Sequence, residues 1–66
     1  MATMYYQRHF EDLAHEIKAT VREVDPSERD AVYALALRLS YRFLRDNPRF
    51  DRTRFLAACE VPEDWP

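Results

Sequence analysis

Few residues in this 66-residue chain have the type and spacing needed for catalysis or metal binding. The two histidines, His9 and His15, lie six positions apart, whereas two ligands on one helical face need a separation of three or four. Glu11 and His15 have that separation, but two ligands without a third nearby do not make a metal site. We therefore expect these side chains to be solvated groups on a helix surface, with no bound metal.

Cys59 is the only cysteine, so the chain can form neither an internal disulfide nor a site with two thiolate ligands. A catalytic thiolate needs a base or a helix N-terminus to lower its pKa, whereas Cys59 precedes Glu60 near the expected end of a helix. The absence of glycine excludes the loops that hold nucleotide phosphates. We predict that Cys59 is a small buried apolar residue. We also predict that the protein is not an enzyme and has no catalytic residue, cofactor or small-molecule substrate.

The composition predicts one small packed domain over residues 1–66. Hydrophobic residues make up 47% of the chain and charged residues 33%, which is typical of a folded domain and not of a disordered tail. The N-terminal residues include no apolar run as long as a signal peptide or a membrane span requires, so we expect a cytoplasmic protein without membrane contact. Below ~70 to 80 residues, a chain without disulfides or metal needs unusually good helix packing or a partner subunit.

Apolar residues repeat at helical spacing, which predicts an all-α fold. The first helix is expected over about residues 3–24. Its apolar face consists of Tyr6, Phe10, Leu13, Ile17, Val21 and Val24. Asp25 and Pro26 then end this helix and begin a second one over about residues 26–46, with Asp25 as N-cap and Glu28 at the capping-box position. The short connection predicts an antiparallel helical hairpin.

The second helix is apolar over most of its circumference. One arc of side chains is predicted to face the first helix and comprises Val32, Leu35, Ala36, Leu39 and Phe43. A second arc, on the far side, comprises Tyr33, Leu37, Tyr41 and Leu44. Two apolar faces need two partners. The second helix is therefore either the centre of three packed helices or the surface at which two subunits meet.

A short third helix is predicted over about residues 52–60, followed by an extended C-terminal tail. An Asn-Pro pair stops the second helix, Asp51 is placed as the next N-cap, and Phe50 should pack on Phe55 as a hydrophobic staple. In the tail, we expect Trp65 to dock on the protein's own helices or on a partner subunit, with its indole N–H near a polar group. The alternative is an acidic-aromatic motif that stays mobile until a partner binds.

The formal net charge of −2 conceals an uneven distribution. Residues 1–30 carry four basic and seven acidic side chains, residues 31–59 carry six and two, and residues 60–66 carry none and three. The six basic residues of the middle segment are Arg38, Arg42, Arg45, Arg49, Arg52 and Arg54. Arginines beside aromatic rings can contact phosphates and stack on bases, and an acidic protein partner is a second interpretation of the same residues. The region of Asp12 across the hairpin, together with Asp46 and Asp51, can instead neutralise them and leave an ordinary charged surface.

The stretch NPRFDRTRFLAACEVP, residues 47–62, resembles the C-terminal segment of small uncharacterised helical proteins of high-GC actinobacteria and their phages or mobile elements. Nine arginines against one lysine agree with a high-GC coding bias. The resemblance covers about a quarter of the chain. It implies provenance, and no shared activity accompanies it.

These patterns together predict a non-enzymatic helical protein-interaction module. We expect a homodimer that also binds an unidentified protein. The predicted interface consists of Tyr33, Leu37, Tyr41, Leu44 and Trp65. The alternative is a nucleic-acid-binding module that uses the arginines of residues 38–54, and it predicts steep salt dependence of binding.

Overall fold

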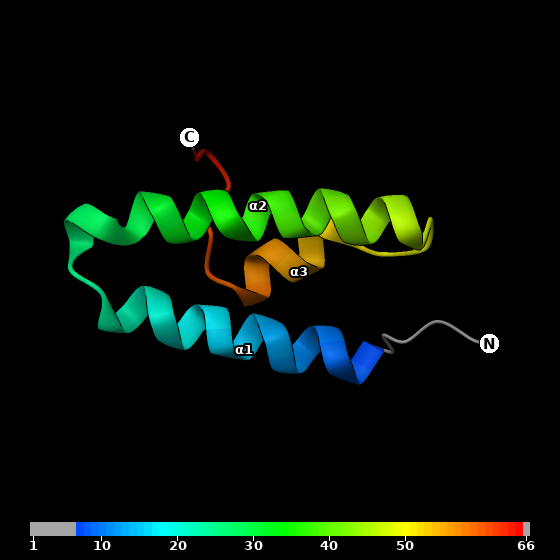
Figure 1. The fold of residues 1–66 in the computed structure, drawn as a ribbon, viewed down its shortest axis with the longest axis horizontal. Coiled ribbons are helices and arrows are strands. Elements are labelled where there is room, and N and C mark those ends of the chain that lie inside the picture. The colour runs from blue at the N-terminus through cyan, green and yellow to red at the C-terminus, as the bar shows by residue number, and fades with distance from the viewer. Residues whose placement is uncertain (1–6, 66) are drawn as a thin grey trace.

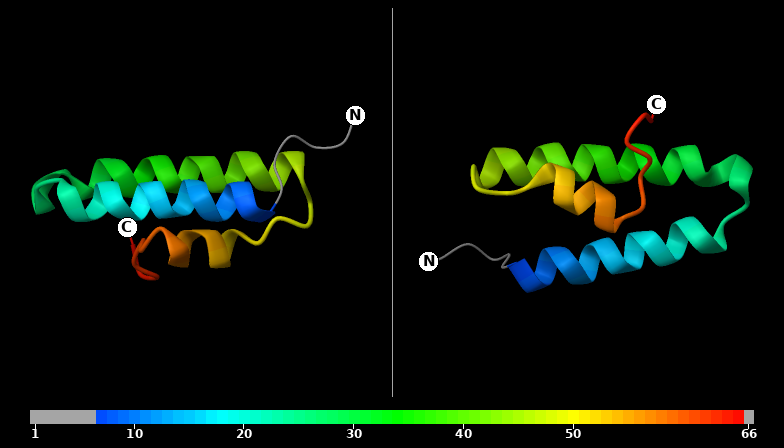
Figure 2. Two further views of the ribbon diagram at one scale, coloured as in Figure 1. Left: turned by 90° about the horizontal axis from the view of Figure 1, so that it is seen from below. Right: turned by 180° about the vertical axis from the view of Figure 1, so that it is seen from behind.

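The computed structural model describes residues 7–65, which form three α-helices joined by short connections (Figure 1). α1 spans Gln7–Glu23, a 3₁₀ turn η1 spans Pro26–Glu28, α2 spans Arg29–Asp46 and α3 spans Arg52–Ala58. α1 and α2 lie side by side and antiparallel, and α3 packs against both from one side of this hairpin (Figure 2). The predicted all-α fold is confirmed over this range, and Tyr6 and the expected first turn of the first helix lie outside it.

The connection between α1 and α2 is as short as predicted because Asp25 caps a 3₁₀ turn. Its Oδ1 accepts hydrogen bonds from the backbone N–H and the hydroxyl of Ser27, at 3.1 and 3.0 Å, and these bonds lower the pKa of Asp25. Asp25 is the N-cap as predicted, but the capping-box role of Glu28 is wrong, because the Glu28 side chain makes no capping hydrogen bond. The tight 3₁₀ turn brings Ser27, and not residue 28, to the Asp25 carboxylate. Arg29 Nε donates to the carbonyl of Val21 at 3.0 Å, which ties the two helices together.

The core lies where the three helices meet, and four phenyl rings fill the end farther from η1. Neighbouring ring centroids in this phenyl cluster lie 4.6 to 5.7 Å apart, at tilted or edge-to-face angles. Its members are Phe10, Phe43, Phe50 and Phe55. Smaller side chains complete the core, namely Ala14, Ile17, Val21, Ala36 and Cys59. Each helix therefore contributes to one shared core.

The local signals at the start of α3 are confirmed. Asp51 Oδ1 accepts a hydrogen bond from the backbone N–H of Arg54 at 3.0 Å, so Asp51 is the N-cap. The rings of Phe50 and Phe55 lie 5.4 Å apart, which is the predicted hydrophobic staple.

α2 contacts two partners, as its apolar arcs predicted, and the second partner is α3 with the tail of the same chain. In the first arc, Ala36 and Phe43 are buried. The placement of Leu35 against the first helix is wrong, because its side chain is 55% exposed. Ala36 and Ser40 occupy the centre of the buried face, which turns α2 towards α3 and leaves Leu35 at the edge.

Ser40 is a polar residue at the centre of the contact between α2 and α3. It is 0% exposed, its Oγ donates to the carbonyl of Leu37 at 2.6 Å, and it accepts from Arg52 Nε at 3.1 Å. Both capacities of the hydroxyl are satisfied, so its burial carries little penalty. The sequence pattern did not predict Ser40 in the core.

α3 ends in a Schellman motif that is built without glycine. The N–H of Glu60 donates to the carbonyl of Ala57, and the N–H of Val61 donates to the carbonyl of Leu56, both at 3.0 Å. The motif places Glu60 at a φ of 65°, a conformation that favours glycine. The Glu60 carboxylate accepts two hydrogen bonds from the Arg22 guanidinium, at 3.0 and 2.7 Å, which lower its pKa and tie this turn to α1.

Two substitutions at Glu60 should reveal the strain in this turn. Glu60→Ala and Glu60→Gly both lose the ion pair with Arg22, but only alanine keeps a Cβ in the left-handed region. We expect the glycine variant to melt about 5 °C higher than the alanine variant. Thermal unfolding followed by circular dichroism measures the difference. Equal melting temperatures would show that residue 60 does not hold a positive φ in solution.

Candidate functional site

The side chains that could act in catalysis or bind a metal do not form a common site in the structure. His15 is exposed on α1, whereas Cys59 is 0% exposed in the core. Within residues 7–65, no group of three or more histidine, cysteine, aspartate or glutamate side chains is placed to hold a metal ion. Burial raises the pKa of the Cys59 thiol to about 11, and the prediction of a small buried residue is confirmed.

Cys59 should resist thiol reagents until the protein unfolds. With the pKa at about 11 instead of 9.0, its thiolate population near neutral pH is about 100-fold lower than that of an ordinary cysteine. The rate of reaction with Ellman's reagent, without and with urea, measures this protection. Because the unfolded thiol ionises first as the pH rises, wild type should lose stability relative to Cys59→Ala between about pH 9 and 11. Fast labelling of the folded protein would contradict a buried thiol.

An open groove lies between α2, α3 and the C-terminal tail. Its volume is about 680 Å³, which is enough for several side chains of a bound partner. Its apolar lining consists of Leu37, Tyr41, Leu56, Ala57, Val61, Pro62 and Trp65. Its polar lining consists of Arg52, Thr53 and Glu63. We call this surface the α2–α3 groove.

Three of the five predicted interface residues, Leu37, Tyr41 and Trp65, line the α2–α3 groove. The other two are partly buried within the chain. Tyr33 contacts Trp65, and Leu44 packs against the core. The groove residues on α3 were not predicted as a binding surface, because their position depends on where α3 packs.

Trp65 forms one wall of the groove because the tail folds back on α2. Its indole Nε1 donates to Asp30 Oδ1 at 3.0 Å. Its ring meets that of Tyr33 edge-on, with centroids 5.6 Å apart. The predicted docking of Trp65 on the protein's own helices, with its N–H on a polar group, is confirmed.

Arg52 and Tyr41 lie at the basic end of the groove. The guanidinium carbon of Arg52 lies 3.9 Å from the centroid of the Tyr41 ring, and its Nε is held by Ser40. Tyr41 is 57% exposed and also lines a shallow hollow on the outer side of α2. The other residues of that hollow are Arg38, Arg42 and Arg45. The apolar groove therefore opens at one end onto a cluster of positive charge.

The six predicted arginines do not form one continuous surface. Arg42 and Arg45 both lie beside Asp46, at 3.2 and 3.8 Å, in exposed ion pairs that contribute little to stability. Arg38 and Arg49 form no ion pair with any residue of the described range, so the expected neutralisation of Arg38 near Asp12 is not found there.

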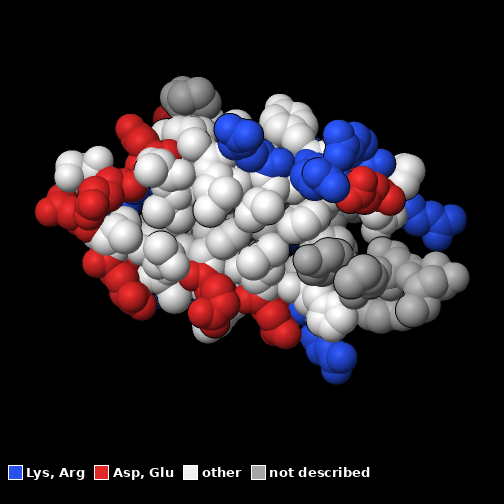
Figure 3. All heavy atoms as spheres, in the orientation of Figure 1, with Lys and Arg blue, Asp and Glu red and all other residues white. Residues whose placement is uncertain are grey.

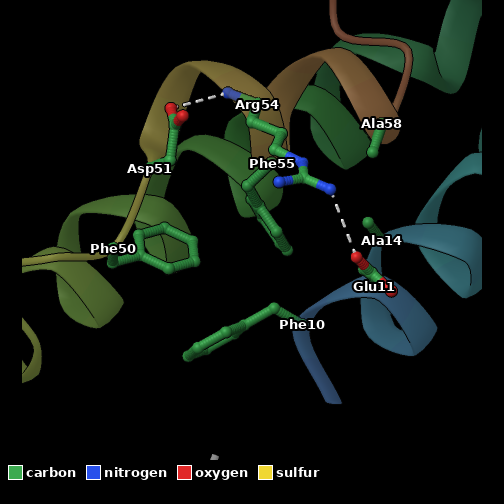
Figure 4. A pocket seen from close by; sticks show the side chains of 8 residues that line it. All are labelled: Phe10, Glu11, Ala14, Phe50, Asp51, Arg54, Phe55 and Ala58. Carbon is green, nitrogen blue, oxygen red and sulfur yellow. Dashed lines mark hydrogen bonds and ion pairs between the residues drawn. The ribbon is translucent and has the colours of Figure 1, made fainter. Parts of the chain in front are cut away.

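Arg54 lies on the side of α3 that faces α1, away from the groove (Figure 4). Its Nη2 lies 3.4 Å from Glu11 Oε2, across a hollow whose apolar lining includes Phe10 and Phe55. Asp51, expected to neutralise an arginine side chain, accepts instead from the backbone N–H of Arg54. The hollow measures about 40 Å³, which admits little more than water. Arg54 therefore links α1 to α3 and does not belong to the basic end of the groove.

No protein-family model matches the chain, and no curated protein or solved structure is significantly similar to it. Within residues 7–65, no helix combines the length and the apolar character that crossing a membrane requires. The functional inference therefore depends on the geometry of the surfaces described above.

Proposed function

We propose that the protein is a non-enzymatic helical interaction module that binds an acidic, amphipathic segment of another protein in the α2–α3 groove. One observation carries this proposal. An apolar groove formed by three segments of the chain opens at one end onto arginines, of which Arg52 is already oriented.

The apolar lining supplies the affinity of this interaction. Leu37, Leu56 and Val61 are only partly buried, so a partner's leucine or aromatic side chains would remove further apolar surface from water. Such burial contributes about 25 cal/mol for each Å². The apolar residues of the partner's segment therefore lie in the α2–α3 groove.

The charges set the direction of the bound segment. The Arg52 guanidinium is held between Ser40 and the ring of Tyr41, so pairing with a carboxylate costs little side-chain entropy. Glu63, in the tail, repels acidic residues at its own position. The acidic end of the segment therefore lies near Arg52 and its apolar end near Trp65.

A peptide selection tests this function. Random peptides displayed on phage and selected on the immobilised full chain should be enriched in acidic residues next to Leu, Phe or Trp. Ala57→Glu places a carboxylate in the groove and should abolish binding of the enriched peptides. Ala58→Glu is the matched control, since Ala58 is also exposed but lines the hollow that faces α1. No enrichment, or equal binding by both variants, would contradict the proposal.

A second candidate function, nucleic-acid binding, is favoured by the hollow on the outer side of α2. Arg38, Arg42 and Arg45 surround an exposed tyrosine there, over about 10 Å of helix. Titration of labelled single- and double-stranded DNA and RNA at two salt concentrations decides between the candidates. Steep loss of binding with salt and weaker binding by Arg42→Glu would support this function. Undetectable binding at low salt would remove it.

A further inference from the structure

We propose that two copies of the chain associate through the face of the hairpin opposite α3, which goes beyond the binding of a segment in the groove. α3 covers one side of α1 and α2, and no other element within residues 7–65 covers the opposite side, which we call the open face (Figure 2). The interface predicted from the sequence lies on the covered side, where Tyr33 and Leu44 are partly buried within the chain. The open side carries a different set of residues.

The centre of this open face is apolar. Arg52 of α3 bonds to Ser40, so that side of α2 faces α3. Leu35 precedes Ser40 by five residues, a rotation of about 140° around the helix, and its 55% exposed side chain lies on the open side.

Val32 and Leu39 lie within about 60° of Leu35 around α2, and Leu13 lies about 60° from Glu16 around α1. All three are partly buried against the core, so they continue this apolar strip between the two helices.

The two edges of the open face carry opposite charges (Figure 3). Acidic side chains follow α1 along one edge, and basic side chains gather over the second half of α2 along the other. Between them, the described residues that are visible are mostly uncharged. On α1, Glu11 contacts Arg54 of α3, and Glu16 follows it by five residues, a rotation of about 140° that turns Glu16 towards the open face. Asp12 lies about one turn before Glu16, and both are exposed and belong to no ion pair with the described residues.

On α2, Arg38 and Arg42 lie two positions before and after Ser40, about 160° around the helix from the side that faces α3, so they belong to this edge. Arg42 also contacts Asp46.

The contact between Phe10 and Phe43 sets which residues lie level along the two antiparallel helices. Six residues from that contact towards η1, Glu16 lies level with Leu37, next to Arg38. Two residues from the contact, Asp12 lies level with Tyr41, next to Arg42. Each carboxylate of α1 therefore has an arginine of α2 at nearly the same height.

A two-fold axis parallel to the helices preserves these heights and places α1 of each copy over α2 of the other. Glu16 then faces Arg38 of the second copy, and Asp12 faces Arg42 of the second copy. Symmetry repeats both pairs, so four ion pairs flank a strip in which Leu35 is covered. An in-plane axis across the helices would instead place arginines over arginines. The charges thus select a second copy of this chain, in one orientation, as the occupant of the face.

This association leaves the α2–α3 groove free. α3 and the tail lie on the outer side of each hairpin, so the dimer presents two grooves. It also occupies Arg38 and Arg42, so the acidic end of a bound segment would pair with Arg52, which lines the groove, and fewer arginines are left for nucleic acid.

Charge reversal tests the interface with the full chain. Sedimentation equilibrium at low salt and tens of micromolar protein should give wild type a mass of about twice 7.9 kDa. The acidic variant carries Arg38→Glu and Arg42→Glu, and the basic variant carries Asp12→Arg and Glu16→Arg. Each alone should self-associate at least about 100-fold more weakly, because all four pairs become repulsive. An equimolar mixture should form the dimer again, since every pair is then attractive.

Two further variants separate this interface from the groove, and circular dichroism verifies that each variant folds. Leu35→Asp should weaken the dimer and retain groove peptides, whereas Ala57→Glu should retain the dimer and lose those peptides. A monomeric wild type at high micromolar concentration would overturn the proposal, as would a dimer that survives either charge reversal. Failure of the mixture to associate would overturn the pairing of α1 with α2.

Discussion

Phe55→Ala should bring the domain close to unfolding at room temperature. Phe55 is 4% exposed, and its ring contacts those of Phe43 and Phe50 at centroid distances of 5.7 and 5.4 Å. Removing a buried phenyl ring costs ~3 to 5 kcal/mol. Domains of this length have a total free energy of unfolding of ~3 to 10 kcal/mol. We therefore expect the melting temperature to fall by at least about 15 °C, as measured by circular dichroism.

Phe55→Leu is the matched control, because leucine keeps most of the apolar volume. It should lower the melting temperature by less than half as much as Phe55→Ala. If both variants melt within a few degrees of wild type, Phe55 does not belong to the core in solution.

The second largest effect is expected from Trp65→Ala. This substitution removes the ring contact with Tyr33 and the hydrogen bond to Asp30. We expect a loss of ~2 kcal/mol, or about 10 °C in melting temperature. Binding of peptides selected on the groove should fall as well, because Trp65 forms one of its walls. Trp65 is the only tryptophan, so its emission in the intact chain should be blue-shifted relative to the free amino acid.

Variants at both ends of this contact show where the stability comes from. Asp30→Asn keeps an oxygen acceptor for the indole N–H and should have a small effect, whereas Asp30→Ala should destabilise. Trp65→Phe keeps a ring but cannot donate, so Asp30→Ala should cost little in that background. Solvent-like emission of wild type, with no change in stability after removal of residues 63–66, would show that the tail is undocked in solution.

Much of the fold was predictable because its signals act over one or two turns. The N-cap at Asp51, the staple between Phe50 and Phe55 and the break after α1 depend on neighbouring residues, and all are found in the structure. The predicted capping box between Asp25 and Glu28 is not found in the structure, because the 3₁₀ turn brings Ser27 to the Asp25 side chain. Whether the first turn forms i→i+3 or i→i+4 backbone hydrogen bonds decides which side chain is capped, and the sequence pattern does not distinguish the two.

The direction in which α2 turns its buried face was not predictable. Rotation of about 100° per residue groups Leu35 with Ala36, but it does not place the third helix. Because α3 packs on the side of Ser40, a serine is buried and a leucine is exposed. The arrangement of α3 depends on contacts among all three helices.

Part of the candidate site was predictable in the same way. The second apolar arc of α2 predicted Leu37 and Tyr41 as binding residues, and the large apolar ring of Trp65 predicted that it would dock on the helices or on a partner. Thr53 and Ala57 enter the groove only through the packing of α3, and neither residue type marks a binding surface. Arg54 was grouped with the other arginines by position in the sequence, although it faces α1.

The phenyl cluster has a consequence for how the chain folds. Its rings come from all three helices and from Phe50, which lies in the connection between α2 and α3. No pair of helices can therefore bury all four rings. With only seven residues, α3 is too short to be stable by itself and must form together with the cluster. The unfolding kinetics should therefore be single-exponential, without a hairpin intermediate. The backbone amides of this shortest helix should exchange with solvent only when the whole domain unfolds.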